Sequence, residues 1–144
     1  MTEENKAIHR SIWEVIWNQG NLDLADEIYD SSHISHGQGI ELPPGPEGLK
    51  SLISIYRAAF PDVHFTIEDQ IAEGDKVVTR WSSRGTHKGA LMGIPATGKQ
   101  TVSAGITMTK FLAGKAIESW NSWDRLGLMQ QIGVVPEMGK RGEG

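Results

Sequence analysis

The sequence contains no cysteine among its 144 residues. This absence excludes disulfide bonds, cysteine-ligated metal centres and thiol nucleophiles. The sequence also lacks any apolar run approaching the roughly 20 residues that a membrane-spanning helix requires. Its residues are 38% hydrophobic and 22% charged, which is typical of soluble globular proteins. We therefore expect a soluble protein that does not insert into a membrane.

Concentrated positive charge is missing as well. The formal net charge is −4, and Lys and Arg are scattered singly apart from the pair Lys140 and Arg141. Phosphate backbones favour a basic face, so nucleic acid is not an expected partner, and a small or neutral ligand fits better. The N-terminal stretch MTEENKAIHR places acids before its first basic residue, unlike a secretory signal. We expect a cytoplasmic protein.

The chain has the length of one domain that can bury a core without disulfides or a structural metal. We assign residues 1–136 to this single domain. Residues 137–144, EMGKRGEG, are predicted to form a flexible C-terminal tail. The sequence shows no internal repeat and no low-complexity block.

Three helices are predicted in the first 60 residues, because apolar residues recur there at three- and four-residue spacing. The first covers residues 5–19, and its apolar face begins at Ile8. A short second helix covers residues 22–29, after the stop signal NQGN. The third covers residues 46–60; it begins at Pro46 and ends before Pro61.

After the third helix the apolar period changes to two. Residues 63–72 and 76–87 predict one hairpin, and residues 101–112 and 116–124 predict a second. The glycine- and proline-rich segment 31–48 is predicted to be a loop, and RLGLMQQIGVVP a half-turn of helix or a loop. Helices followed by long hairpins favour an α+β domain, in which helices cover one face of a curved sheet and close a cone around a pocket.

Three stretches resemble a known family: GPEGLKSLISIYRAAFPDVHFTIEDQIAEGDKVVTRW, RGTHKGALMGIPATGK and ESWNSWDRLGLMQQIG. Together they resemble the SnoaL-like polyketide cyclases, or ester cyclases, of the nuclear-transport-factor-2-like superfamily, over residues 5–136. The resemblance implies a cone-shaped, strongly curved mixed or antiparallel sheet packed against three N-terminal helices. It also implies a deep, mostly apolar pocket and a homodimer.

The resemblance implies catalysis by an aspartate on the last long strand, which acts as acid and base in an aldol ring closure. Here that position holds Asn121, and a histidine that some members place on the preceding strand falls at Thr107. An amide cannot give or take a proton near neutral pH. Asn121 could instead donate a hydrogen bond to a substrate carbonyl or enolate, or it could satisfy a buried backbone group.

Histidines are the other candidates for chemistry. His36 matches a pocket-mouth position in the family, and histidine is the residue type best suited to proton transfer near neutral pH, so His36 is a second catalytic candidate. His33, three residues earlier, raises the alternative of a metal site, but no further ligands follow at regular spacing and we predict no metal. His87 is either a pocket residue or a structural partner for the following loop. His9 is predicted to be exposed, and so is His64.

Strand alternation selects further candidates for binding substrate. Trp123 shares a face with Asn121, whereas Trp120 and Glu118 point to the other face. Asp124 is predicted to cap the turn that follows it.

Other candidates come from the helices and the preceding strand. Trp17 and Tyr56 lie on helices that can close the cone, and Thr107 and Met108 complete the predicted lining. For each of these side chains, ordinary core packing is the alternative.

These observations predict a cofactor-independent enzyme of the cyclase type, with aldol or related enolate chemistry on a polyketide-like or other apolar carbonyl compound. Asn121 would polarise the carbonyl, and His36 or a water would move the proton. Two alternatives remain open. One is a binding protein that has lost the family carboxylate, and the other is a hydrolase, dehydratase or isomerase on the same scaffold.

Overall fold

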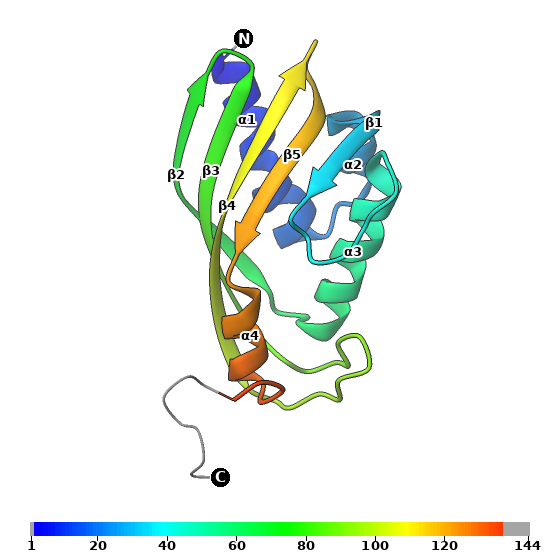
Figure 1. Cartoon of the computed structure of the whole chain (residues 1–144), viewed down its shortest axis with the longest axis vertical. Coiled ribbons are helices and arrows are strands. Elements are labelled where there is room, and N and C mark those ends of the chain that lie inside the picture. Colours follow the sequence, from blue (N-terminus) through cyan, green and yellow to red (C-terminus); the bar gives the residue numbers. More distant parts are fainter. Residues whose placement is uncertain (1, 137–144) are drawn as a thin grey trace.

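A computed structural model describes residues 2–136, which fold as helices packed against one five-stranded sheet (Figure 1). The predicted tail at 137–144 lies outside the described residues. The elements in chain order are α1 (Thr2–Ser11), η1 (Ile12–Trp17), α2 (Asp23–Ile28), β1 (Tyr29–His36), α3 (Pro46–Ala59), β2 (His64–Glu73), β3 (Lys76–Thr86), β4 (Gln100–Leu112), β5 (Lys115–Trp123) and α4 (Arg125–Gln131). Within the described part, no helix is both long and apolar enough to cross a membrane.

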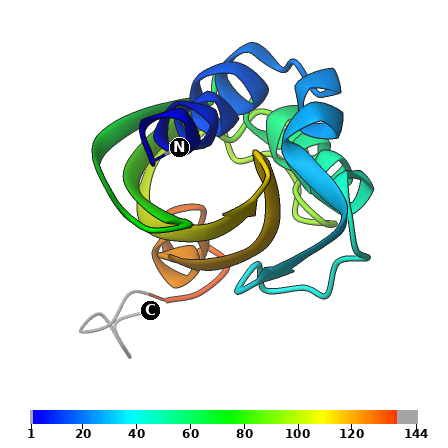
Figure 2. The same cartoon turned by 90° about the horizontal axis from the view of Figure 1, so that it is seen from above.

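The sheet has the strand order β1-β5-β4-β3-β2. Both predicted hairpins are confirmed: β2 pairs antiparallel with β3, and β4 with β5, while β3 and β4 also pair antiparallel. The register shifts at Glu68 of β2 and at Ile117 of β5, where each strand has one extra residue, and such bulges increase strand bending. Viewed along the long axis, the sheet forms an arc that α1 and α3 close into a ring, so the predicted α+β cone is confirmed (Figure 2).

The prediction of a loop over residues 31–48 is wrong at its start. Tyr29–His36 is a strand that runs parallel to β5, with Ile34 opposite Glu118 and His36 opposite Trp120. The segment is rich in serine and histidine and has little intrinsic preference for a strand. Its conformation is therefore set by the partner strand, which supplies hydrogen bonds that local sequence cannot reveal.

The first predicted helix is present, but its buried face differs from the predicted apolar face that begins at Ile8. A π-helical segment, η1, continues α1, and the buried residues are Asn5, His9, Ile12, Trp13 and Ile16. The prediction that His9 is exposed is therefore wrong: its side chain is fully buried. A histidine can lie there because both ring nitrogens have hydroxyl partners in the sheet.

The chain after β5 forms a short helix, α4, which packs near β4 (Figure 1). The Asp124 side chain accepts a hydrogen bond from the Gly127 amide at 2.8 Å, as expected of a residue that caps the turn. Leu128 and Ile132 of this region pack with Phe60 and Leu91 in a second apolar cluster. This cluster closes one end of the cone.

Candidate functional site

A pocket lies between the concave face of the sheet and the helices. Its helical wall is almost entirely apolar and is formed by Ile12, Trp13, Trp17, Leu49, Leu52, Ile53, Tyr56 and Phe60. Its sheet wall carries hydroxyl and amide groups beside two indoles, from Trp81, Ser83, Thr101, Ser103, Thr107, Ser119, Asn121 and Trp123. The pocket therefore suits a guest with an apolar body and one polar edge.

Strand alternation in β5 determines which residues reach the pocket. Ser119, Asn121 and Trp123 line it, and Glu118 and Trp120 do not. This is the face that alternation predicted for Asn121 and Trp123. Sequence therefore located the polar wall correctly along this strand.

Asn121 is held by a network that uses both of its N–H groups. Its Nδ2 donates to the backbone oxygen of His36 at 2.8 Å and to Ser35 Oγ at 3.2 Å. Its Oδ1 accepts from Thr107 Oγ1 at 2.9 Å. Trp81 Nε1, which can only donate, bonds to Thr107 Oγ1 at 3.2 Å, so the threonine hydroxyl proton is free for Asn121. Asn121 thus ties β1 to β5 and β4 within the pocket wall.

A row of aromatic rings spans the pocket from the helices to the sheet. The ring centroids of Trp17 and Tyr56 are 6.5 Å apart, and those of Tyr56 and Trp123 are 6.0 Å apart. All three residues line the pocket, in the positions proposed for substrate binding. Burial raises the pKa of Tyr56, and the nearby Arg125 partly opposes this increase. These edge-to-face rings offer a surface for a flat apolar guest.

His36 lies on the outside of the sheet rather than in the pocket lining. Its Nε2 is 2.7 Å from Glu118 Oε2, its ring stacks on Trp120, and its side chain is 45% exposed. Because β1 is a strand, alternation points Ser35 inward and His36 outward. The structure therefore does not bring the two predicted catalytic side chains together.

Two predicted substrate-binding residues also lie outside the lining. His87 is fully buried, stacks on Phe60 and accepts a hydrogen bond at Nδ1 from the Thr97 amide at 3.3 Å. It thus holds the loop after β3, which was the structural alternative. Met108 alternates with Thr107 on β4, so Thr107 faces the pocket and Met108 the opposite side.

His33 is the residue of the pocket lining that sequence reasoning undervalued. It is 1% exposed, and its Nε2 lies 2.8 Å from Ser119 Oγ. Burial lowers the pKa of His33 to about 4. The same β1 alternation that turns His36 outward places Tyr29, His33 and Ser35 along the pocket. Recognising residues 29–36 as a strand would have found it.

The described lining residues include no Asp or Glu. Two tyrosines, one histidine and the cation Arg84 are its ionisable members. Burial raises the pKa of Tyr29 above its usual range, so its phenol stays protonated near neutral pH. Among residues 2–136, no group of three His, Asp or Glu side chains is placed to hold a metal ion.

A family model for the SnoaL-like polyketide cyclases matches residues 7–132 of the sequence. The chain belongs to the SnoaL-like polyketide cyclase family. This SnoaL-like chain is also 29% identical to aklanonic acid methyl ester cyclase DnrD of Streptomyces peucetius, over 81% of its own length and 83% of DnrD.

Solved structures extend this similarity to the whole fold. TsrD from Streptomyces laurentii is 25% identical with a TM-score of 0.82, and the match covers 92% of the SnoaL-like chain and 97% of TsrD. A proposed polyketide cyclase from Acidithiobacillus ferrooxidans is 32% identical with a TM-score of 0.78, covering 90% and 94% of the two chains. AclR from Streptomyces galilaeus, a proposed hydroxylase, shares the fold with a TM-score of 0.84 at 24% identity, over 97% and 87%. The fold alone therefore does not decide the reaction.

Proposed function

We propose that this protein is a cofactor-independent enzyme of the cyclase type, which promotes intramolecular aldol chemistry on a polyketide-like carbonyl compound. The observation that carries the proposal is the division of the pocket into an apolar helical wall and a hydroxyl- and amide-bearing sheet wall. A folded polyketide chain has a flat carbon body and oxygens along its edge, so each wall has a matching partner. The family and the similarity to DnrD support the same reaction class.

In this proposal the substrate's carbonyl lies at the Asn121 side of the sheet wall. To bind it, the Asn121 amide exchanges its longer hydrogen bond, to Ser35 at 3.2 Å, for the substrate oxygen. Its bond to the His36 carbonyl at 2.8 Å holds the side chain in place. A donor fixed in an apolar pocket stabilises the developing enolate oxygen. We do not retain the proton-moving role for His36, because its ring is paired with Glu118 outside the pocket.

Turnover of an aromatic polyketide methyl ester tests the proposed function. Aklanonic acid methyl ester, the substrate class named for DnrD, is the first compound to assay. We expect ring closure to remove the NMR signals of the protons α to the ketone and the ester, while the molecular mass of the compound stays constant. A wild-type protein that binds this compound and related esters without converting any of them would contradict the proposal.

Replacing Asn121 by alanine should lower kcat/KM by about 100-fold, the usual cost of losing one oxyanion donor. Ser122→Ala is the matched control, because Ser122 is the next residue of β5 and lies on the exposed face. Circular dichroism should show both variants folded. If N121A turned over substrate as fast as S122A, Asn121 would have no part in the reaction.

Ligand binding without turnover is a second candidate function, and the absence of a carboxylate from the described lining favours it. The variant Asn121→Asp separates the two candidates. If the wild type only binds, N121D restores a titratable group at the family position and should gain ring-closing activity. If the wild type is already the enzyme, N121D should not exceed its rate.

We also propose that the protein forms a homodimer through the outer face of the sheet. Val102 and Ile106 of β4 are 66% and 46% exposed there, and with the exposed Ala104 between them they form an apolar strip on the outer face. The double variant Val102→Lys, Ile106→Lys should therefore sediment as a monomer while the wild type sediments as a dimer. Leu112→Lys, at the tip of the hairpin, is the control and should not change the mass. A monomeric wild type would rule the dimer out.

A further inference from the structure

A continuous chain of hydrogen bonds runs from the pocket wall into the core. His33 Nε2 lies 2.8 Å from Ser119 Oγ, which lies 2.8 Å from Thr109 Oγ1. Thr109 Oγ1 lies 2.8 Å from His9 Nε2, and His9 Nδ1 lies 2.7 Å from Thr79 Oγ1. All five side chains are buried, and the first two line the pocket. The chain therefore connects an imidazole in the pocket wall to a second imidazole behind it.

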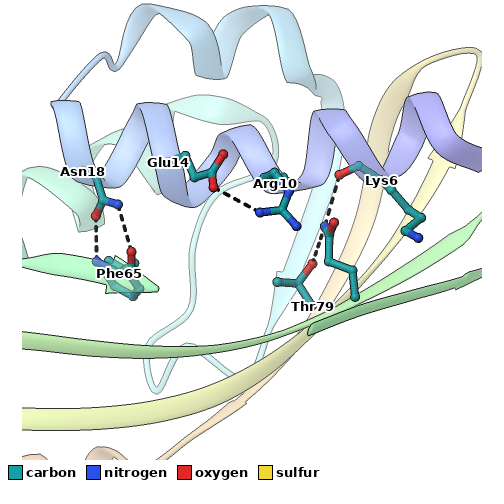
Figure 3. A network of polar contacts seen from close by, with 7 residues as sticks. Lys6, Arg10, Glu14, Asn18, Phe65 and Thr79 are labelled. Atoms are coloured by element: carbon teal, nitrogen blue, oxygen red, sulfur yellow. Dashed lines mark hydrogen bonds and ion pairs between the residues drawn. The ribbon is translucent and has the colours of Figure 1, made fainter. Parts of the chain in front are cut away.

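The far end of the chain is fixed by an amide. Gln70 Nε2 donates to Thr79 Oγ1 at 3.0 Å and to the backbone oxygen of Lys6 at 3.1 Å (Figure 3). Because an amide nitrogen can only donate, Thr79 Oγ1 accepts this bond and keeps its own proton for another partner. In one direction of the chain, that proton goes to His9 Nδ1.

The direction in which these hydrogen bonds are donated decides which nitrogen of His33 carries the proton. If Thr79 donates to His9, each later group donates onward, Ser119 donates to His33 Nε2, and the His33 proton sits on Nδ1. If every bond is reversed, His33 Nε2 donates to Ser119, and Nδ1 presents a lone pair. The first arrangement leaves the His33 Nδ1 hydrogen without an acceptor in residues 2–136, and the second does the same for the Thr79 hydroxyl hydrogen. Each arrangement leaves one hydrogen unmatched, and the second also leaves the lone pair of His33 Nδ1 without a donor among the described residues.

His33 Nδ1 itself is buried and has no hydrogen-bond partner among the described residues. His9 has both ring nitrogens paired, whereas His33 Nδ1 and His87 Nε2 are buried without a hydrogen-bond partner among the described residues. Of these two unpaired histidines, only His33 lines the pocket. Nδ1 of His33 can either donate to a carbonyl or accept from a hydroxyl, depending on the direction of the hydrogen bonds. His33 belongs to a pocket lining that has no carboxylate among its described residues. Its Nδ1 is covered by neighbouring atoms, so a substrate reaches this nitrogen only when a neighbouring side chain moves aside.

The charges around His33 are compatible with a neutral imidazole that can take up a proton. Burial is the main reason that its pKa falls to about 4, and the carboxylates of Glu118 and Asp30 oppose this effect while His36 adds to it. The imidazole is therefore unprotonated at pH 7. An oxyanion formed beside it would raise its pKa by ion pairing.

We propose that His33 is the catalytic residue that accepts the substrate proton and returns it, with Ser119, Thr109 and His9 as positioning residues that set its tautomer. This assignment rests on the proposed function for the identity of the reaction. In the first step the α C–H bond breaks, its electron pair forms the enolate, and the proton bonds to His33 Nδ1. The enolate carbon then attacks the second carbonyl, and the resulting alkoxide takes the proton back from Nδ1. The sequence is redox-neutral and needs no co-reactant.

Binding of nitrophenols tests the proton acceptor independently of turnover. Each phenol is added at a pH below its solution pKa, and its absorption spectrum reports whether the bound molecule is ionised. We expect phenolate in the wild-type protein, un-ionised phenol in His33→Gln, and a reduced phenolate fraction in Ser119→Ala. His36→Gln, which alters the exposed histidine three positions away, is the control and should match the wild type. Un-ionised phenol in the wild type, or equal ionisation in H33Q, would overturn the assignment.

Turnover of the polyketide ester then tests the catalytic role. Loss of a general base costs about 10²–10⁴-fold in rate, so H33Q should lose kcat within this range while KM stays within a few-fold. The acidic limb of the wild-type pH–rate profile should disappear in H33Q and shift in S119A, which a merely structural role would not cause. An H33Q variant with the wild-type rate and profile would refute the proposal. Phenol ionisation without any turnover would instead refute the proposed function and leave His33 as the proton acceptor of a binding pocket.

Discussion

Lowering the pH from about 7 to about 5 should reduce the free energy of unfolding steeply, because two histidines are buried in their neutral form. Burial lowers the pKa of His9 to about 3 and that of His33 to about 4, against an ordinary value of 6.5. Below pH 6.5 the unfolded chain binds protons that the folded chain does not. The stabilisation is therefore complete above pH 6.5 and is lost as the pH falls toward the folded-state values. Each histidine contributes a slope of up to about 1.4 kcal/mol per pH unit in this window.

Urea unfolding at several pH values measures this effect. The variant His9→Gln should be less stable at pH 7 and should lose about half of the slope, whereas His64→Gln, at an exposed position, should keep all of it. Asp62 accepts hydrogen bonds from Thr86 that lower its pKa below 3.8, so its contribution falls in a more acidic window. A stability that stays flat between pH 6.5 and 5 would show that these histidines are not buried as neutral groups.

Gly37→Ala should be one of the most destabilising single substitutions in the chain. Gly37 has a φ of 83°, and a Cβ there would lie 2.0 Å from the backbone oxygen of Asn121. An L-residue in this backbone conformation costs about 1–2 kcal/mol, and overpacking against fixed backbone adds about 1–3 kcal/mol. We expect a loss of about 2–5 kcal/mol in the free energy of unfolding. The substitution also pushes the end of β1 away from Asn121, so the pocket wall should be disturbed as well.

Gly74→Ala separates the two contributions. Gly74 also has a positive φ, 61°, but no heavy atom lies within 4 Å of the site where a Cβ would be placed. This variant should therefore lose only the backbone contribution of about 1–2 kcal/mol. Urea denaturation of both variants gives the comparison directly. Equal losses in G37A and G74A would mean that β1 does not pack against Asn121 as described.

Sequence alone was sufficient for most of the fold, because long periodic segments dominate it. The hairpins at 63–87 and 101–124 and the helix at 46–60 carry strong apolar periods, and each is present within a few residues of its predicted bounds. Strand β1 was missed because parallel pairing with β5 joins residues 84 to 87 positions apart and leaves no local signal. His9 was misplaced for a similar reason, because its hydroxyl partners come from strands distant in the sequence.

The residues of the candidate site could likewise be predicted from the sequence only in part. Alternation within β5 correctly placed Asn121 and Trp123 on the pocket face, because a strand's two faces follow from sequence parity. On β4 the prediction named both Thr107 and Met108 as lining, and only Thr107 faces the pocket. His36 was predicted to lie at the pocket and lies outside it, whereas His33 lines the pocket without having been proposed for it. The faces of both residues depend on β1 being a strand. The bonds that occupy both N–H groups of Asn121 depend on Ser35 and on the His36 carbonyl, and so they required the three-dimensional structure.

A crystal structure of the protein with a cyclised aromatic polyketide ester bound would test the central claim most directly. The account predicts the ring system against Trp17, Tyr56 and Trp123, and its oxygen-bearing edge against the sheet wall, with one oxygen within hydrogen-bond distance of Asn121 Nδ2. A ligand bound outside the pocket, or one whose oxygens face the helical wall, would contradict the claim that this pocket orients a polyketide-like carbonyl compound.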